Sequence, residues 1–282
     1  MQTVTTLAAL RPATEALRAG GSLALVPTMG ALHEGHLTLV REARKAADHV
    51  AVSIFVNPRQ FGANEDLDAY PRQLARDSAL LEAEGVALLW APPADEVYPQ
   101  GYATSVSVAG ISEGLCGGDR PGHFDGVATV VCKLFNQVRP DMAFFGEKDW
   151  QQLAVIRRMA RDLDLTLPHV DAIHGVPIVR EADGLAMSSR NAYLSAGQRA
   201  AAAALPFHMR EAIARIDAGE DAEATLAWFS QQLLEAGFDS IDYAELRQGA
   251  DLAPARDATP GNRLFVAARI GGTRLIDNMP VA

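Results

Sequence analysis

The first half of the chain alternates short, continuous hydrophobic runs with longer stretches in which hydrophobic residues recur every three or four positions. The runs predict strands at 22–26, 50–56, 86–90, 142–145 and 167–172. The longer stretches predict helices at 34–47, 73–84, 127–138 and 149–163. Strands that are hydrophobic throughout are buried on both faces, as in parallel sheets covered by helices. We therefore expect a doubly wound parallel sheet.

The pattern changes after about residue 176. Helices are predicted at 195–218 and 222–237, and strands at 240–247, 263–270 and 273–276. The predicted fold class is thus α/β, a Rossmann-like doubly wound parallel sheet with a smaller C-terminal α+β domain. We expect the domains to span residues 1–175 and 176–282, although no Pro- or Ser-rich linker marks the junction.

Composition narrows the class of protein. Of the 282 residues, 49% are hydrophobic and 21% charged, as expected for a globular protein, and the net charge is −10. The acidic balance disfavours nucleic acids and anionic membranes as partners. No hydrophobic run approaches the roughly 20 residues of a membrane span, and the N-terminus does not resemble a signal peptide. Two isolated cysteines, Cys116 and Cys132, indicate reduced thiols in a cytoplasmic protein.

The most informative motif is Pro-Thr-Met-Gly-Ala-Leu-His-Glu-Gly-His at 27–36, which follows a predicted strand and opens a predicted helix. Unpaired amides and the helix dipole favour phosphate there, and Gly30 and Gly35 allow close approach to the backbone. His33 and His36 are three residues apart, hence predicted on one helical face, where both imidazoles could contact a triphosphate. The alternatives are a metal-binding histidine pair, or a glycine turn with two surface histidines.

Polar residues also follow two other predicted strands, at the sheet edge where such folds bind ligands. Gln60, after the second strand, offers both a donor and an acceptor to a hydroxyl-bearing substrate; the alternative is a simple Asn-Pro turn. Lys148 supplies a positive charge suited to phosphate. Asp149 and Gln152 have the spacing of a capping box, which would explain Asp149 without a ligand.

Two further segments carry possible anion contacts. Ser188, Ser189 and Arg190 form a compact set of donors suited to phosphate. A flexible Ser/Asn loop explains the same residues equally well. Arg120-Pro-Gly-His-Phe offers another anion contact, although an ordinary turn explains it better.

In combination these motifs resemble the pantoate–β-alanine ligase family, over nearly the whole chain from Val26 to Asn278. The resemblance rests on seven segments in order: 27–36, 54–61, 69–72, 120–124, 145–149, 187–191 and 275–278. The family is related to class I aminoacyl-tRNA synthetases, whose signatures are HIGH and KMSKS. His-Glu-Gly-His at 33–36 is a variant of the first. Ala-Met-Ser-Ser-Arg at 186–190 departs from the second, because it lacks both lysines.

The resemblance implies condensation of (R)-pantoate with β-alanine, driven by ATP with Mg²⁺, through an enzyme-bound pantoyl adenylate. It implies catalytic roles for His33, His36 and Lys148, with His36 as proton donor to the leaving pyrophosphate. Pantoate would contact Gln60 and Gln152, with Gln60 also near β-alanine. The implied ATP-binding residues are Met29, Gly30, Ala31, Leu32, His33, Glu34, Gly35, His36, Gly146, Glu147, Lys148, Asp149, Val179, Met187, Ser188, Ser189 and Arg190.

In this interpretation the first domain binds nucleotide and pantoate, and the second covers the active site. The resemblance also implies a homodimer, while composition and charge indicate the cytoplasm with neither nucleic acid nor membrane as a partner; the motifs identify no metal ligands. One alternative is another nucleotidyltransferase with a HIGH-type motif, such as a cytidylyltransferase or a truncated tRNA synthetase. The other is a non-catalytic nucleotide-binding module, which the retained His36 and Lys148 disfavour.

Overall fold

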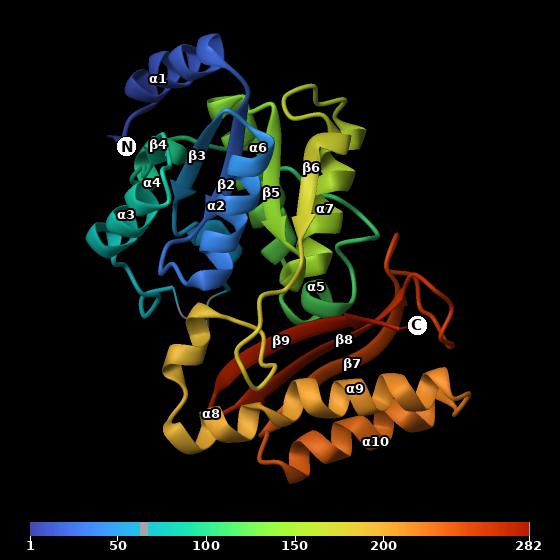
Figure 1. The fold of residues 1–282 in the computed structure, drawn as a ribbon. Helices are drawn as coiled ribbons and strands as arrows, with labels where there is room; N and C mark the ends of the chain where they lie inside the picture. The colour runs from blue at the N-terminus through green and yellow to red at the C-terminus, as the bar shows by residue number, and fades with distance from the viewer. Residues whose placement is uncertain (63–66, 282) are drawn as a thin grey trace. The chain divides into compact units, whose positions relative to one another are not determined.

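The computed structural model describes residues 1–62 and 67–281, and the chain forms two compact units (Figure 1). The first unit contains residues 1–112, 120–147 and 152–177. The second contains 178–282 together with two short segments from the first half of the chain, 113–119 and 148–151. The predicted division of functions between residues 1–175 and 176–282 stays a prediction.

A six-stranded parallel sheet forms the centre of the first unit. Its strands are β1 (Gln2–Val4), β2 (Leu23–Thr28), β3 (His49–Ile54), β4 (Leu88–Trp90), β5 (Met142–Gly146) and β6 (Ile173–Val176). Their order in the sheet is β1-β4-β3-β2-β5-β6. The chain first builds outward from β2 and then returns to add β5 on its other side. The carboxyl ends of β2 and β5 therefore flank the topological switch point, where open α/β sheets bind ligands.

Helices alternate with these strands along the chain and pack against the sheet (Figure 1). They are α1 (Leu7–Gly20), α2 (Glu34–Ala46), α3 (Leu74–Ala83), α4 (Ala94–Val97), α6 (His123–Val138) and α7 (Trp150–Asp162). Ala24 and Val26 of β2 share a buried cluster with Val40 and Ala43 of α2. Because alternate residues of a strand point to opposite faces, the equally buried Leu25 faces the other layer.

Two predictions in this unit need correction or completion. The strand expected at 167–172 is wrong: Val170–Ala172 is a 3₁₀ turn, capped by His169 Nδ1, and the strand follows at 173–176. Pro168 has no N–H for a sheet ladder, which favours the turn. Helix α1 was not predicted from the sequence, although Thr6 caps its first turn and its residue Leu10 is fully buried.

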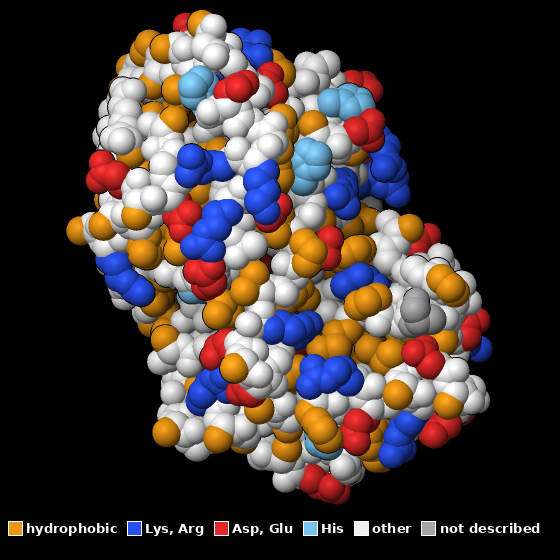
Figure 2. Space-filling model, viewed as in Figure 1, with side chains coloured by type: hydrophobic (Ala, Val, Ile, Leu, Met, Phe, Trp, Pro, Cys, Tyr) orange, Lys and Arg blue, Asp and Glu red, His pale blue; other side chains and the backbone are white. Residues whose placement is uncertain are grey.

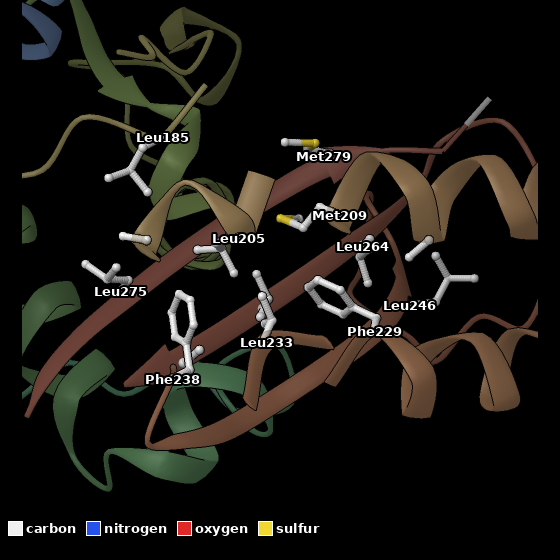
Figure 3. Close-up of a cluster of buried hydrophobic side chains, with 14 of the residues drawn as sticks. Leu185, Leu205, Met209, Phe229, Leu233, Phe238, Leu246, Leu264, Leu275 and Met279 are labelled. Atoms are coloured by element: carbon white, nitrogen blue, oxygen red, sulfur yellow. The ribbon is translucent and has the colours of Figure 1, made fainter. Parts of the chain in front are cut away.

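The second unit contains a three-stranded antiparallel sheet, β7 (Ser240–Gln248), β8 (Asn262–Ile270) and β9 (Thr273–Pro280). Its helices are α5 (Leu115–Asp119), α8 (Ala196–Ala202), α9 (Ala204–Asp217) and α10 (Ala222–Glu235). Met209 of α9 and Phe229 and Leu233 of α10 pack on Leu246 and Leu264 of the sheet (Figure 3). The two sheets and their helices confirm the predicted fold class.

The single helix expected at 195–218 is two helices, with the break at Ala203. Pro206 lies in the first turn of α9, where its missing N–H costs nothing. In a continuous helix the same proline would lie in the interior and remove a hydrogen bond. This explains why the chain restarts its helix there.

The surface carries both signs of charge. On the face drawn in Figure 2, Lys and Arg side chains are interrupted by acidic, polar and hydrophobic ones. Among residues 1–62 and 67–281, no helix combines the length and hydrophobicity needed to cross a bilayer.

Candidate active site

The turn between β2 and α2 is held in place by a buried carboxylate. Gly30 and Ala31 both have positive φ, +85° and +51°. Asp77 of α3 accepts hydrogen bonds from the Ala31 N–H (2.8 Å) and the Leu32 N–H (3.0 Å). Glycine suits residue 30 for two reasons: its φ is positive, and a Cβ there would lie 3.1 Å from an Asp77 oxygen.

Sequence reasoning did not find Asp77. The signal was present but weak, since Asp77 lies four residues before the buried Leu81 and hence on the same face of α3. A carboxylate on the buried face of a helix requires donors, and here the donors are the amides of the turn.

Several amides that the sequence suggested would be unpaired at this turn have partners within the protein. Besides the two bonds to Asp77, the Gly30 N–H donates to Thr28 Oγ1 at 3.2 Å, and the Gly35 N–H donates to His33 Nδ1 at 3.1 Å. The His36 N–H donates to the His33 carbonyl. These amides are therefore already hydrogen-bonded within the turn.

The two histidines do not both lie in the helix, which corrects a second expectation. His33 is the N-cap residue, with extended backbone, and only His36 lies within α2. The His33 N–H donates to His36 Nδ1 at 3.3 Å, and the two ring centres are 4.1 Å apart. Because Nδ1 is an acceptor in both rings, the proton of each neutral imidazole is on Nε2. Each ring thus carries its proton on the nitrogen that does not take part in the helix cap.

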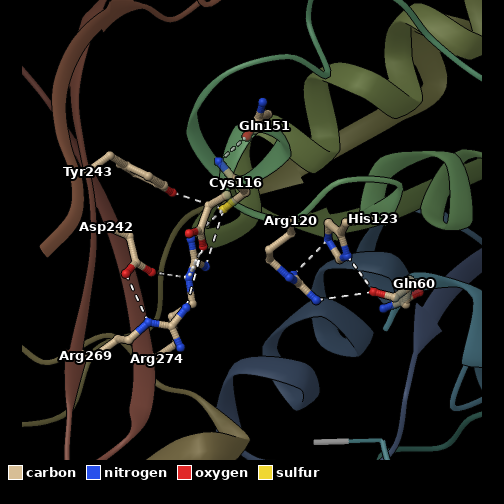
Figure 4. Close-up of polar contacts among 10 residues, drawn as sticks. Gln60, Cys116, Arg120, His123, Gln151, Asp242, Tyr243, Arg269 and Arg274 are labelled. Atoms are coloured by element: carbon tan, nitrogen blue, oxygen red, sulfur yellow. Dashed lines mark hydrogen bonds and ion pairs between the residues drawn. The ribbon is translucent and has the colours of Figure 1, made fainter. Parts of the chain in front are cut away.

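Gln60 lies at the end of the 3₁₀ turn η1 (Pro58–Gln60), after β3, and is buried. Its carbonyl accepts from His123 Nδ1 at 2.8 Å and from Arg120 Nη2 at 3.3 Å (Figure 4). Its side-chain Oε1 accepts from Asn57 Nδ2 at 3.1 Å, and its Nε2 lies 3.0 Å from Met29 Sδ. The segment at 120–123 therefore fixes the Gln60 backbone, a role that the sequence did not indicate.

The segment after β5 is anchored in the second unit. Gly146 ends β5, and Glu147, Lys148 and Asp149 form the 3₁₀ turn η2. The Lys148 carbonyl accepts from Asn278 Nδ2 of β9 at 3.0 Å. Trp150 Nε1 donates to the Gly249 carbonyl at 2.8 Å. These bonds fix the backbone from which the Lys148 side chain extends.

The two neighbouring glutamines of α7 differ in their contacts. Gln151 is buried, and its Oε1 accepts from the Cys116 N–H at 3.0 Å (Figure 4). Its Nε2 donates to the Gly114 carbonyl at 3.2 Å. Both ends of its amide therefore bind the backbone at the start of α5. Gln152 is half-buried in the first unit, and among the described residues its amide makes no such bonds.

Residues 179–187 form a small hairpin, and the 3₁₀ turn η4 (Ser189–Tyr193) follows it. The Val179 carbonyl accepts from the Met187 N–H at 3.0 Å, and Ser188 caps η4 by accepting from the Arg190 N–H at 3.3 Å. Asn191 Nδ2 donates to Glu181 Oε1 at 2.8 Å. The segment is thus an ordered hairpin and turn, which disfavours the flexible-loop interpretation.

One end of β9 supports both of these segments in the second unit. Asp277 is buried and binds the Arg180 guanidinium with both oxygens, at 2.7 and 2.9 Å. The next residue, Asn278, holds the Lys148 carbonyl and accepts from Arg263. In the sequence, residues 275–278 contributed only to the family resemblance, and no role was predicted for them.

Both cysteines are free thiols. Cys116 Sγ lies 3.0 Å from the Tyr243 hydroxyl and 3.7 Å from the Arg274 guanidinium (Figure 4). Burial and the neighbouring thiol raise the pKa of Tyr243. Partial burial likewise raises the pKa of the Cys132 thiol.

In the described part of the chain, no group of three or more His, Cys, Asp or Glu side chains could hold a metal ion. Within those residues, His33 and His36 therefore do not belong to a cluster that would complete a metal site.

The doubly wound parallel sheet, with its switch point between β2 and β5, places the chain among α/β folds that commonly bind nucleotides. Comparison with known proteins then identifies the family: the pantoate–β-alanine ligase family model matches residues 2–280. A pantothenate synthetase from Novosphingobium aromaticivorans is 68% identical over all of this chain and 99% of its own length. The chain belongs to the pantoate–β-alanine ligase family and is a ligase.

Solved structures agree with this assignment. The pantothenate synthetase from Thermus thermophilus is 46% identical, with a TM-score of 0.92, covering 100% of this chain and 99% of that one. A pantoate–β-alanine ligase from Francisella tularensis, complexed with beta-gamma ATP and β-alanine, is 31% identical with a TM-score of 0.84. That match covers 99% of this chain and 97% of the other.

Proposed function

We propose that this chain activates the carboxylate of (R)-pantoate with ATP and then transfers the pantoyl group to β-alanine. The observation that carries this proposal is the imidazole pair at the carboxyl end of β2, within a chain of this family. Two Nε2–H donors beside the switch point suit a polyphosphate. The Francisella relative complexed with an ATP compound and β-alanine supports the same substrates.

In the first step a pantoate carboxylate oxygen attacks the α-phosphorus of ATP. The bond from that phosphorus to the bridging oxygen breaks, giving pantoyl adenylate and pyrophosphate. Catalysis of such a step is chiefly positioning and stabilisation of charge on the phosphoryl oxygens. We assign the leaving pyrophosphate to His33 and His36, with His36 donating through Nε2. Its Nδ1 already accepts the His33 N–H, which favours a hydrogen-bond donor over a doubly protonated acid.

The remaining phosphate contacts come from other segments. Lys148 supplies a full positive charge, and Ser188, Ser189 and Arg190 supply further donors. The other residues proposed to contact ATP lie in the β2–α2 turn, in Gly146–Asp149 and in the hairpin at Val179 and Met187. Mg²⁺ enters as part of the ATP substrate, held largely by phosphate oxygens as is usual for this ion.

In the second step the neutral amine of β-alanine attacks the pantoyl carbonyl carbon. The bond from that carbon to the AMP oxygen breaks, AMP leaves, and the amine loses its extra proton to water. Gln60 and Gln152 hold pantoate, and Gln60 also lies near the incoming amine. No covalent bond to the enzyme forms, so neither cysteine is required.

We also propose that the chain acts in the cytoplasm, as its composition indicates, and as a homodimer, as the family resemblance implies. Sedimentation at twice the chain mass of 30.1 kDa tests the second point.

The direct test of the function is an assay of AMP formation with ATP, Mg²⁺, (R)-pantoate and β-alanine, omitting each in turn. The proposal expects steady turnover only with all of them, with pantothenate and AMP formed in equal amounts. Steady turnover without pantoate, or with a phosphorylated alcohol in its place, would instead support another nucleotidyltransferase activity.

A further inference from the structure

We propose that Tyr98 is a positioning residue that fixes the orientation of the Gln60 amide through Asn57. The inference rests on the proposed role of Gln60 in binding pantoate and goes beyond it, because it specifies which end of the amide faces the substrate. All three residues belong to the first unit.

The hydrogen bonds around Asn57 allow only one orientation of its side chain. Its Oδ1 lies 2.8 Å from the Tyr98 hydroxyl and 3.3 Å from the Arg59 N–H. Its Nδ2 lies 3.1 Å from both Gln60 Oε1 and the Gly126 carbonyl. A rotated amide would place its NH₂ against the Arg59 N–H and its oxygen against the Gly126 carbonyl. Asn57 is only 1% exposed, so water cannot replace these partners.

The Tyr98 hydroxyl is the side-chain donor to Asn57 Oδ1. Its ring is held by Tyr102, with ring centres 5.0 Å apart, and by Phe55 at 6.1 Å. The Arg59 guanidinium lies 5.6 Å from the centre of the same ring. Burial raises the pKa of Tyr98 above its ordinary value, so the hydroxyl keeps its proton across the working pH range.

The orientation passes from Asn57 to Gln60. Because Gln60 Oε1 accepts from Asn57 Nδ2, the Nε2 end of the amide is directed away from Asn57, on the side of Met29. One N–H of Nε2 donates to Met29 Sδ, and the other suits an oxygen acceptor such as a carboxylate or the lone pair of a hydroxyl. This refines the expectation that Gln60 offers donor and acceptor alike.

The backbone of Gln60 is fixed independently. His123 and Arg120 bind its carbonyl (Figure 4), and a Cβ at Gly126 would lie 2.2 Å from the Arg59 carbonyl oxygen and 2.7 Å from Gln60 Cα. Because the main chain of Gln60 is held on both sides, only the orientation of its side-chain amide remains to be fixed. Tyr98 fixes that orientation through Asn57.

The first experiment compares Y98F with Y102F in steady-state kinetics. Y98F removes the donor to Asn57 and keeps the ring, whereas Y102F removes a hydroxyl from the same aromatic cluster. Within residues 1–62 and 67–281, the Tyr102 hydroxyl makes no hydrogen bond. We expect Y98F to raise the KM for pantoate about tenfold, the effect of one buried hydrogen bond. The KM for ATP should stay within about twofold, and Y102F should match the wild type.

The second experiment asks whether Tyr98 acts through Gln60. We expect Q60A to raise the KM for pantoate about 100-fold, and Y98F to add nothing further in the Q60A background, because contacting residues are not additive. An equal effect of Y98F on both substrates, or full additivity with Q60A, would indicate general structural damage and overturn the proposal.

The third experiment tests the orientation itself and does not depend on the stability of Y98F. In Q60E one oxygen can still accept from Asn57, but the other places an acceptor where Nε2 stood. We expect Q60E to bind pantoate more weakly than Q60A does. Pantoate affinity retained in Q60E would overturn the donor orientation.

The outcomes separate the two proposals. If Q60A weakens pantoate binding and Y98F behaves like Y102F, the role of Tyr98 fails while the site assignment stands. If Q60A leaves the KM for pantoate unchanged, the assignment of Gln60 fails and the proposal for Tyr98 fails with it.

Discussion

The two ring nitrogens of His36 serve different purposes. Nδ1 accepts the N–H of His33 and so helps to begin α2, while Nε2 carries the proton that we assign to phosphate. Protonation of Nδ1 would remove the lone pair that this capping bond requires. The residue therefore contributes to the local fold and to the proposed chemistry through opposite sides of one ring.

The first prediction follows from that division. H36A should slow adenylate formation about 100-fold or more, the usual contribution of a positioned donor or acid. H36Q, whose amide nitrogen reaches close to the position of Nε2, should retain part of the lost rate. Single-turnover measurement of pyrophosphate release gives the rate of adenylate formation for both variants. Turnover near wild type in H36A would remove His36 from the mechanism.

Lys148 gives the second prediction. K148A should lower kcat/KM for ATP by at least about 100-fold, because a full charge opposite the phosphates is lost. K45A is the matched control, since Lys45 is exposed and pairs only with Glu42 in the described part of the chain. Unchanged ATP kinetics in K148A would move phosphate binding to another residue.

For individual residues, the sequence suggested candidate site side chains, whereas it did not indicate the residues that support them. His33, His36, Gln60 and Lys148 follow strands in recognisable motifs. Asp77 lies far from them along the chain, within an ordinary amphipathic helix. Its importance depends on a contact across 45 residues or more, which no local pattern encodes.

At the scale of elements, the β2–α2 turn depends on α3 for its shape. Asp77 is fully buried and binds the two amides that follow Gly30. Since Ala31 also has positive φ, the turn would relax without these bonds.

The third prediction is that D77N destabilises the protein by about 2–4 kcal/mol, because one amide then faces an NH₂ group instead of an acceptor. D162N, an exposed substitution at the end of α7, should change stability by less than about 0.5 kcal/mol. Urea unfolding of the two variants makes the comparison. Equal midpoints would show that Asp77 does not support the turn.

The hairpin at 179–187 gives the fourth prediction. The hydrogen bond from Arg199 lowers the pKa of Asp183. A carboxylate with a lowered pKa stabilises the fold above its unfolded pKa, and that contribution is lost as pH falls through the folded pKa. The Tm difference between wild type and D183N should therefore be present at pH 7 and shrink as the pH falls below the ordinary carboxyl range.

This pair is partly exposed, so its contribution should be below about 1 kcal/mol. Melting curves over pH 3–7 follow the difference directly. A difference that grows as the solution becomes more acidic would contradict the assigned sign.

Elements with strong periodicity were predictable, and those that depend on distant contacts were not. Helix α2 was expected at 34–47 and spans Glu34–Ala46. The hydrophobic run at 167–172 became a turn because Pro168 and the His169 cap act locally against a strand. The helix expected at 195–218 broke where Pro206 permits a new first turn.

At the scale of the whole molecule, chain order and spatial grouping differ. Residues 113–119 and 148–151 precede the rest of the second unit by many residues and yet belong to it. Their anchors are long-range hydrogen bonds, such as that from Asn278 to the Lys148 carbonyl. Spacing along the chain could not have shown this arrangement.

The proposed reaction depends on one intermediate, the pantoyl adenylate. If it forms, pyrophosphate release needs only ATP, Mg²⁺ and pantoate, whereas AMP release needs β-alanine as well. The two products therefore separate in time when β-alanine is withheld.

The most direct test is rapid-quench measurement of pyrophosphate from enzyme mixed with Mg·ATP and (R)-pantoate alone. We expect a burst approaching one pyrophosphate per active site, followed by AMP release when β-alanine is added. No pyrophosphate before β-alanine is present, or ADP in its place, would contradict the adenylate mechanism.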